Sequence, residues 1–268
     1  MVHKPPPNDT AVVAMKNDVI PTLAALRLNE SRLFQYCIAH YDSRSTENPT
    51  FEASVGDLKR FFEIDYADAY PILRQAVINI GSKPIEWRDG NVQHFENWFT
   101  GFSYYGGTGR FVFRINRAAE PFFLTLKECF TRYRLAFTKH FRHAASVKLY
   151  INLKQHKKMG HWNPALDDLK HRLGVGGKYS RWSDLRERIL QPSMSEINKH
   201  SDLSVGWKPT KSGRRATGVA FRIKNKTEKS ATEAREVHEA NQRLKTAQEE
   251  EKRLGINHVE FDPLRIST

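Results

Sequence analysis

Hydrophobic residues recur at helical spacing in three segments of the first third of the chain. The first segment follows Asn29, a suitable N-cap, the second opens at Ser54, and the third runs from about Asp68. The residues on the inward faces of these segments are Leu33, Phe34, Cys37, Ile38 and Tyr41, then Val55, Leu58, Phe61 and Phe62, then Tyr70, Leu73, Val77 and Ile80. The pattern predicts three short helices packed around an apolar centre.

The spacing then changes to the alternation that is typical of strands. Ile85 to Arg88 predicts a short strand, Asp89-Gly90 a turn, and residues 92–105 a second extended stretch. Gly106 to Gly109 turn the chain again, and residues 110–115 alternate between polar and apolar positions. Three helices followed by a β ribbon are the order of elements in a winged helix.

The same order recurs in the second half of the chain. The predicted elements are a helix at about 145–157, a helix from Asn163-Pro164 to Gly174, a helix from Ser180 to Asn198, and alternating strands at 203–207 and 219–223. Pro192 predicts a kink within the third of these helices. The fold class predicted from both halves is α+β, with two tandem winged-helix domains, each a helix-turn-helix with a β-hairpin wing.

The predicted domain boundaries follow from these elements. Residues 1–19 are assigned to a flexible arm, 20–136 to a first winged-helix domain, 137–224 to a second, and 225–268 to a charged tail that is helical or disordered.

Composition narrows the function classes. The chain has 268 residues, enough for two small domains, and no apolar run approaches the roughly 20 residues that span a bilayer. The N-terminus carries three consecutive prolines and no apolar signal-peptide core, which predicts a cytoplasmic protein without membrane contact. Two cysteines, Cys37 and Cys129, cannot form a disulfide framework or a zinc finger.

Charge is distributed unevenly along the chain. The whole chain carries a formal net charge of +13, whereas residues 226–268 contain eight Lys/Arg and nine Asp/Glu and therefore carry −1. The first 225 residues consequently carry +14. A folded body this basic is typical of proteins that bind a polyanion, most commonly nucleic acid.

The second predicted helix-turn-helix concentrates the residues suited to DNA binding. Its second helix would enter the major groove, where arginine makes bidentate contacts with guanine, and the wing would lie on the backbone or in the minor groove. The candidate DNA-binding residues are Ser180, Arg181, Trp182, Ser183, Arg186 and Arg188 on the helix, and Lys208, Lys211, Arg214 and Arg215 on the wing. Arg186 is the first candidate for reading a base, with Arg181 as its competitor. A charged, solvated face around a caged Trp182 is the alternative interpretation.

The same segment resembles a known family. The sequences LDDLKHRLGVGGKYSRWSDLRERILQPSMSEINKHSDLSVGW and KSGRRATGVAFRI are similar to the Rep_3 family of initiator replication proteins of iteron-type, theta-replicating bacterial plasmids. LNESRLFQYCIAHYDSR, DAYPILRQAV, FTRYRLAF and SVKLYINLKQH resemble the first domain and linking helix of that family. The resemblance covers about residues 17–224.

The resemblance implies a plasmid-encoded protein of bacterial cytoplasm with no cofactor. It implies binding to direct repeats of double-stranded origin DNA, origin opening, contact with the host initiator ATPase and replicative helicase, and repression of its own transcription by a dimer at an inverted repeat. By position, the reading helix is Ser180 to Asn198, and its first-domain counterpart is about Asp68 to Ile80, where Arg74 would contact the DNA backbone. The resemblance assigns dimerisation and accessory DNA contact to the first domain and the main sequence-specific DNA reading to the second. The implied dimer surface contains Phe95, Trp98, Phe99, Phe102, Tyr104 and Tyr105. Core packing explains some of these aromatic residues equally well.

Two other function classes are compatible with a basic protein, a nicking enzyme and a transcriptional repressor. A nicking enzyme needs two histidines separated by one residue to hold a metal beside a tyrosine nucleophile, but His140 and His143 are three residues apart and the chain contains no His-x-His. The sequence shows no catalytic site and no metal site. A transcriptional repressor that uses the same motif on an operator remains the alternative function.

Overall fold

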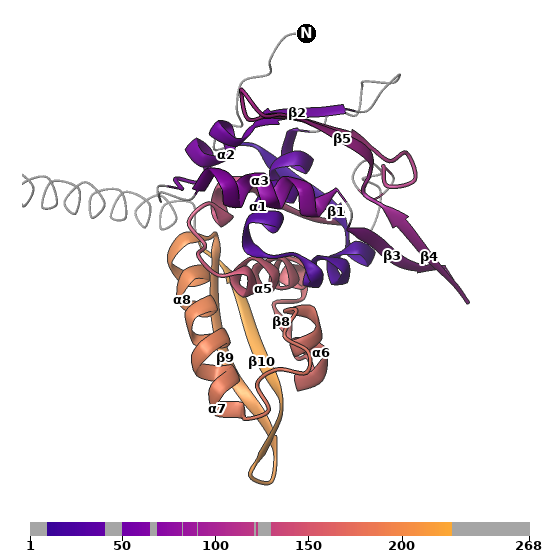
Figure 1. Ribbon diagram of the computed structural model, residues 1–268. Coiled ribbons are helices and arrows are strands. Elements are labelled where there is room, and N and C mark those ends of the chain that lie inside the picture. Colours follow the sequence, from indigo (N-terminus) through magenta and orange to yellow (C-terminus); the bar gives the residue numbers. More distant parts are fainter. Residues whose placement is uncertain are drawn as a thin grey trace, which may run out of the picture. The chain divides into compact units, whose positions relative to one another are not determined.

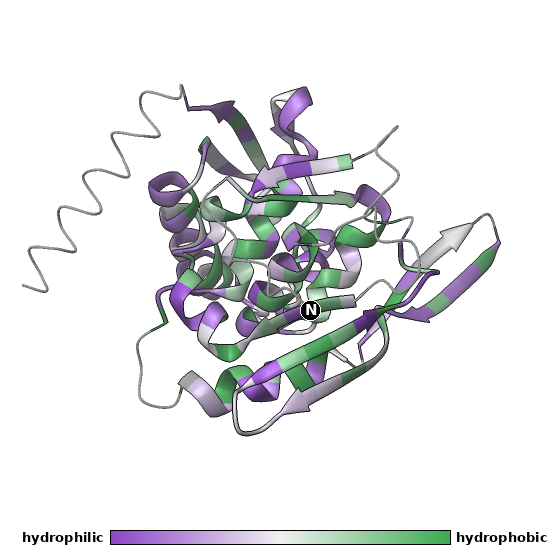
Figure 2. Cartoon of the chain, turned by 90° about the horizontal axis from the view of Figure 1, so that it is seen from above, coloured by the Kyte–Doolittle hydropathy of each residue, from purple (hydrophilic) through white to green (hydrophobic). Residues whose placement is uncertain are grey.

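The computed structural model describes residues 10–40, 50–64, 69–81, 83–89, 91–120, 122 and 130–226 (Figure 1). The predicted arm before Thr10 and the predicted tail after Lys226 lie outside the described residues. None of the helices in the described ranges is long and apolar enough to cross a membrane. Hydrophobic residues, green in Figure 2, run through the helices and strands that pack against one another.

Three helices of the first domain form where the hydrophobic spacing predicts them. They are α1 at Leu28–His40, α2 at Val55–Phe61 and α3 at Ala69–Ile80. Ser54 begins α2 with a capping box, because its hydroxyl accepts from the Asp57 amide at 3.1 Å and its own amide donates to the Asp57 carboxylate at 2.8 Å. The N-terminal end of this seven-residue helix is therefore specified locally.

A three-stranded antiparallel sheet covers these helices. Its order is β2-β6-β5, with β2 at Thr50–Ser54, β5 at Phe99–Tyr105 and β6 at Arg110–Ile115. Phe111 and Phe113 alternate inward into the core, as the sequence pattern predicts. A separate hairpin is formed by β3 at Pro84–Asp89 and β4 at Val92–Asn97.

The predicted flexible arm is wrong for residues 12–19. Val12–Lys16 forms strand β1, which pairs with β7 at Phe130–Arg134, and Asn17–Ala25 forms a 3-10 helix, η1. Val13 and Met15 are fully buried, and Val19, Ile20 and Leu23 of η1 join the same core. The partner strand of β1 lies more than 110 residues further along the chain, so no local pattern identifies the pairing.

The segment predicted as the second domain follows a short 3-10 helix, η2, at Leu135–Thr138. Its elements are α5 at Ala144–Gln155, η3 at Lys157–Met159, β8 at His161–Trp162, α6 at Leu166–Arg172, a helix from Trp182 to His200, and the wing strands β9 at Leu203–Ser212 and β10 at Arg215–Asn225. β10 lies between β8 and β9 in one antiparallel sheet. The predicted order of helix, helix, turn, helix and hairpin is confirmed.

Helix α6 begins later than predicted. Its N-cap is Ala165, not Asn163, and no side chain caps it. The Pro164 carbonyl accepts from the Val219 amide at 3.2 Å, and Ala165 makes an isolated β-bridge with Gly218. The segment before α6 is therefore held extended along β10, and this pairing delays the helix.

The helix that carries the DNA-binding candidates is continuous but irregular. Trp182–Leu185 (α7) leads into a π-helical turn at Arg186–Leu190 and then into α8 at Gln191–His200. The π turn ends two residues before Pro192, which lacks the N–H needed to continue the regular hydrogen-bond ladder. The sequence thus indicates where the irregularity lies. We refer to Trp182–His200 as the reading helix.

Candidate nucleic-acid interface

The entrance of the reading helix presents exposed polar and basic side chains. Ser180, Arg181, Ser183 and Arg188 are exposed, whereas Trp182 is half-buried. Arg181 is the residue that precedes the first helical turn, in extended conformation. Leu185 and Leu190 point into the core and fix the orientation of the helix. Arg181 and Arg188 therefore lie on the outer face of the reading helix.

Arg186 forms an ion pair with the next residue of the reading helix. Its guanidinium Nη2 lies 2.6 Å from the Glu187 carboxylate, and its Nε atom is buried. The Arg186 side chain is 42% exposed, and an exposed ion pair of this kind costs little to break. Arg186 therefore stays a predicted base reader beside Arg181.

The turn between α6 and the reading helix forms an open basic hollow. Gly174, Gly177 and Tyr179 all have positive φ, at 71°, 72° and 54°, which bends the chain sharply between the two helices. The hollow has a volume of about 420 Å³. Its lining residues are Asp167, Lys170, His171, Gly176, Gly177, Lys178 and Ser180. Of these residues, only Ser180 was predicted from the sequence to contact DNA. The sequence signal that could have identified this hollow is the pair Gly176-Gly177 with basic residues on both sides, Lys170 before it and Lys178 after it.

The wing extends from the reading helix (Figure 1). Figure 1 shows the β9–β10 hairpin running beside α8 and projecting beyond α7. Midway along β9, the ring of Trp207 packs edge-on against Trp182, with centroids 6.3 Å apart. This aromatic contact joins the wing to the first turn of the reading helix.

The basic residues of the wing are all exposed, but their side chains lie on different sides of the hairpin. Lys208, Lys211, Arg214 and Arg215 are all exposed, and Gly213, with φ of 58°, makes the turn at the tip. Because side chains alternate along a strand, Lys211 lies on the same side of β9 as Trp207, and Lys208 lies on the opposite side. Lys211 therefore shares the face of the wing that packs against the reading helix.

A smaller basic and aromatic cluster lies on α3 of the first domain. Arg74 is exposed, and its guanidinium lies 5.3 Å from the centroid of the Tyr104 ring. The Tyr104 hydroxyl donates to the Tyr70 hydroxyl at 2.9 Å. Burial and this hydrogen bond raise the pKa of Tyr104 to about 12. The structure thus links Arg74 and Tyr104, which the sequence analysis assigned to separate functions.

Comparison with known families identifies the two halves of the chain. Residues 12–154 match the family described as Initiator Replication protein, WH1, and residues 165–223 match Initiator Rep protein, WH2. The chain belongs to the initiator replication protein family. The two winged-helix domains predicted from the sequence are thereby confirmed.

A solved structure shares the fold of this initiator. It is described as the crystal structure of Pi initiator protein in complex with iteron DNA. The two chains superpose with a TM-score of 0.70 at 20% identity, over 82% of this chain and 100% of the other. At this identity the likeness establishes the fold of the initiator.

Two of the predicted dimer residues belong to the core of the initiator. Trp98 and Phe99 are 2% and 5% exposed. Trp98 packs edge-on against Phe34 with centroids 4.5 Å apart, and Phe99 stacks on Phe113 at 4.3 Å. Both residues sit where β4 passes into β5, and a register shift follows Phe99. This burial corrects the prediction that they lie on an exposed dimer surface.

The remaining predicted dimer residues are accessible to different degrees. Phe95 on β4 is 61% exposed and Tyr105 at the end of β5 is 45% exposed. The Arg110 guanidinium lies 4.3 Å from the centroid of the Tyr105 ring. Phe102 and Tyr104 are half-buried. Phe95 and Tyr105 are therefore the residues of this set that a second copy could contact directly.

Proposed function

We propose that this initiator binds direct repeats in double-stranded origin DNA, with the reading helix in the major groove and the wing on the adjacent backbone. The observation that carries the proposal is the exposure of basic residues at three neighbouring places: the helix entrance, the preceding turn and the wing tip. Helix-turn-helix proteins use this arrangement on DNA. The described complex of the structurally similar Pi initiator with iteron DNA supports the choice of ligand.

The proposal divides the basic residues between two roles. Arg181, Arg186 and Arg188 of the reading helix contact base edges, because arginine can donate two hydrogen bonds to guanine O6 and N7. Lys170 and Lys178, which line the hollow, contact phosphates together with Lys211, Arg214 and Arg215 of the wing. Ser180 and Ser183 bind phosphate oxygens at the helix entrance. Arg74 of the first domain contributes an accessory backbone contact.

Substitution should separate the base readers from the backbone contacts. Arg181→Ala is expected to lower affinity for the cognate repeat and to relax the preference at one or two base positions by about 1–3 kcal/mol. Lys211→Ala should weaken binding to cognate and random duplexes equally. The measurement is the binding of each variant to the repeat and to every single-base change of it. Unchanged discrimination in both Arg181→Ala and Arg188→Ala would contradict the assigned orientation of the reading helix.

Initiation and repression are distinguished by the DNA that the protein protects. We infer that monomers bind the direct repeats and promote origin opening, with the host initiator ATPase and replicative helicase as partners. We also infer that dimers, paired through the first domain, bind an inverted repeat and repress the gene. A nuclease footprint of the DNA beside the coding region is expected to show protected direct repeats. Protection of an inverted repeat alone would favour the second candidate function, a transcriptional repressor.

A further inference from the structure

A buried lysine lies at the junction between the two winged-helix domains. Lys148 on α5 is 6% exposed, and its ammonium group donates to the carbonyl oxygens of Ala24 at 2.7 Å and Leu173 at 3.3 Å. Ala24 belongs to η1, and Leu173 is the C-cap residue that follows α6. One side chain therefore joins the backbone of the first domain to that of the second.

The second of these contacts is adjacent to the turn that leads to the reading helix. Leu173 is followed by Gly174, whose φ is 71°. A Cβ atom at Gly174 would collide with the Ala24 carbonyl oxygen and with the Lys148 ammonium. The backbones of η1 and of the DNA-reading turn thus approach each other closely, and Lys148 lies at the point of approach.

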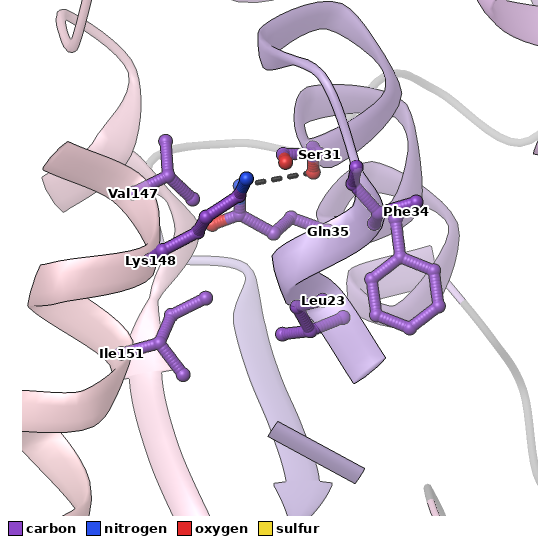
Figure 3. Close-up of a pocket in the computed structure, with 8 residues that line it drawn as sticks. Leu23, Ser31, Phe34, Gln35, Val147, Lys148 and Ile151 are labelled. Carbon is purple, nitrogen blue, oxygen red and sulfur yellow. Dashed lines mark hydrogen bonds between the residues drawn. The ribbon is translucent and has the colours of Figure 1, made fainter. Parts of the chain in front are cut away.

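The surroundings of Lys148 make its burial costly. Figure 3 shows Lys148 between Val147 and Ile151 on α5, with Leu23 of η1 across the gap. Burial lowers the pKa of Lys148 to about 8, although the Glu30 carboxylate acts in the opposite direction. Lys83 and Lys178 also face this group and lower its pKa further. The two hydrogen bonds to backbone carbonyl oxygens offset part of that desolvation cost, so the lysine is explained by the two segments that it joins.

We propose that Lys148 is a positioning residue that fixes the DNA-reading turn of the second domain against the first domain, so that both domains engage one duplex as a single body. The proposal rests on the proposed function. Two linked modules bind more tightly than either alone only when their geometry allows both to engage at once. Lys148 supplies part of that geometry.

Hydrogen exchange of the full-length protein tests the junction without DNA. The amide of Leu26 donates to Leu23 and the amide of Val175 donates to Lys170, so each reports on one side of the junction. In Lys148→Met, both amides should exchange about tenfold faster while amides in the two cores keep their rates. Lys148→Arg, which retains donors, should restore slow exchange at least in part.

Lys83→Met is the matched control for this measurement. Lys83 donates to the Ala25 carbonyl at 2.9 Å and pairs with Glu30 at 3.4 Å, both within the first domain. Its loss should affect Leu26 and leave Val175 unchanged. Uniform acceleration of exchange in Lys148→Met, or no acceleration at Val175, would overturn the positioning role. If Lys148→Met does not fold, Lys148→Gln replaces it, and exchange at Leu26 and Val175 decides.

DNA binding tests the consequence of the junction. The probes are a duplex that carries one footprinted direct repeat and two shorter duplexes that each carry half of it. Lys148→Met should bind the full repeat about tenfold more weakly and both halves as the wild type does. Equal losses on all three duplexes, or no loss on the full repeat, would contradict the proposal. If the wild-type protein binds none of them, the proposed function fails, and hydrogen exchange alone decides the role of Lys148.

Discussion

Raising the salt concentration from 50 to 200 mM is expected to lower the affinity of this initiator for its repeat by about 10³–10⁵-fold. The expectation assumes about 6–10 phosphate contacts, each of which releases condensed counterions from the DNA. The basic residues that line the hollow and the wing tip, together with Arg74, are enough to make that number of contacts. Residues 1–225, which carry these basic side chains, have a net charge of +14, and the remaining 43 residues have a net charge of −1.

The measurement is a series of binding isotherms at increasing salt, plotted as the logarithm of affinity against the logarithm of salt concentration. Lys211→Ala and Lys178→Ala should each reduce the slope by about one unit if each contacts one phosphate. Lys208→Ala is the matched control, because Lys208 lies on the other side of β9 from Lys211. A wild-type slope near zero would mean that the basic surface is not the DNA-binding face.

Phe99→Ala is expected to lower the free energy of unfolding by about 3–5 kcal/mol, because it removes a ring that stacks on Phe113 in the core. Phe95→Ala should change it by less than about 0.5 kcal/mol, because Phe95 is largely exposed. Denaturant unfolding of the two variants measures the difference. Similar losses in both variants would contradict the assignment of Phe99 to the core.

The same pair of residues separates folding from self-association. If the first domain forms the proposed dimer through β4 and β5, Phe95→Asp and Tyr105→Asp should yield folded protein with fewer dimers, and binding by the reading helix should persist. Sedimentation at several protein concentrations measures the dimer population. An unchanged population in both folded variants would place the dimer interface on another surface.

Elements with local signals were predicted from the sequence. The Ser54 capping box marks the start of α2. Gly174, with its positive φ, marks the turn that follows α6. The alternation of polar and apolar residues over 110–115 marks strand β6. Each signal acts within a few residues, through a cap, a backbone conformation or a side-chain period. The order of these elements occurs once in each half of the chain, and this was enough to predict two winged helices and the position of the reading helix.

The tertiary structure alone decided features that depend on distant partners. Strand β1 pairs with β7, Lys148 joins Ala24 to Leu173, and the segment before α6 is held extended by β10. Aromatic residues with the same strand spacing lie partly in the core and partly on the surface. Phe99 stacks on Phe113 in the core, whereas Phe95 is exposed to solvent. A residue's type fixes which contacts it can make. Which of them forms depends on long-range packing, which a local sequence pattern does not encode.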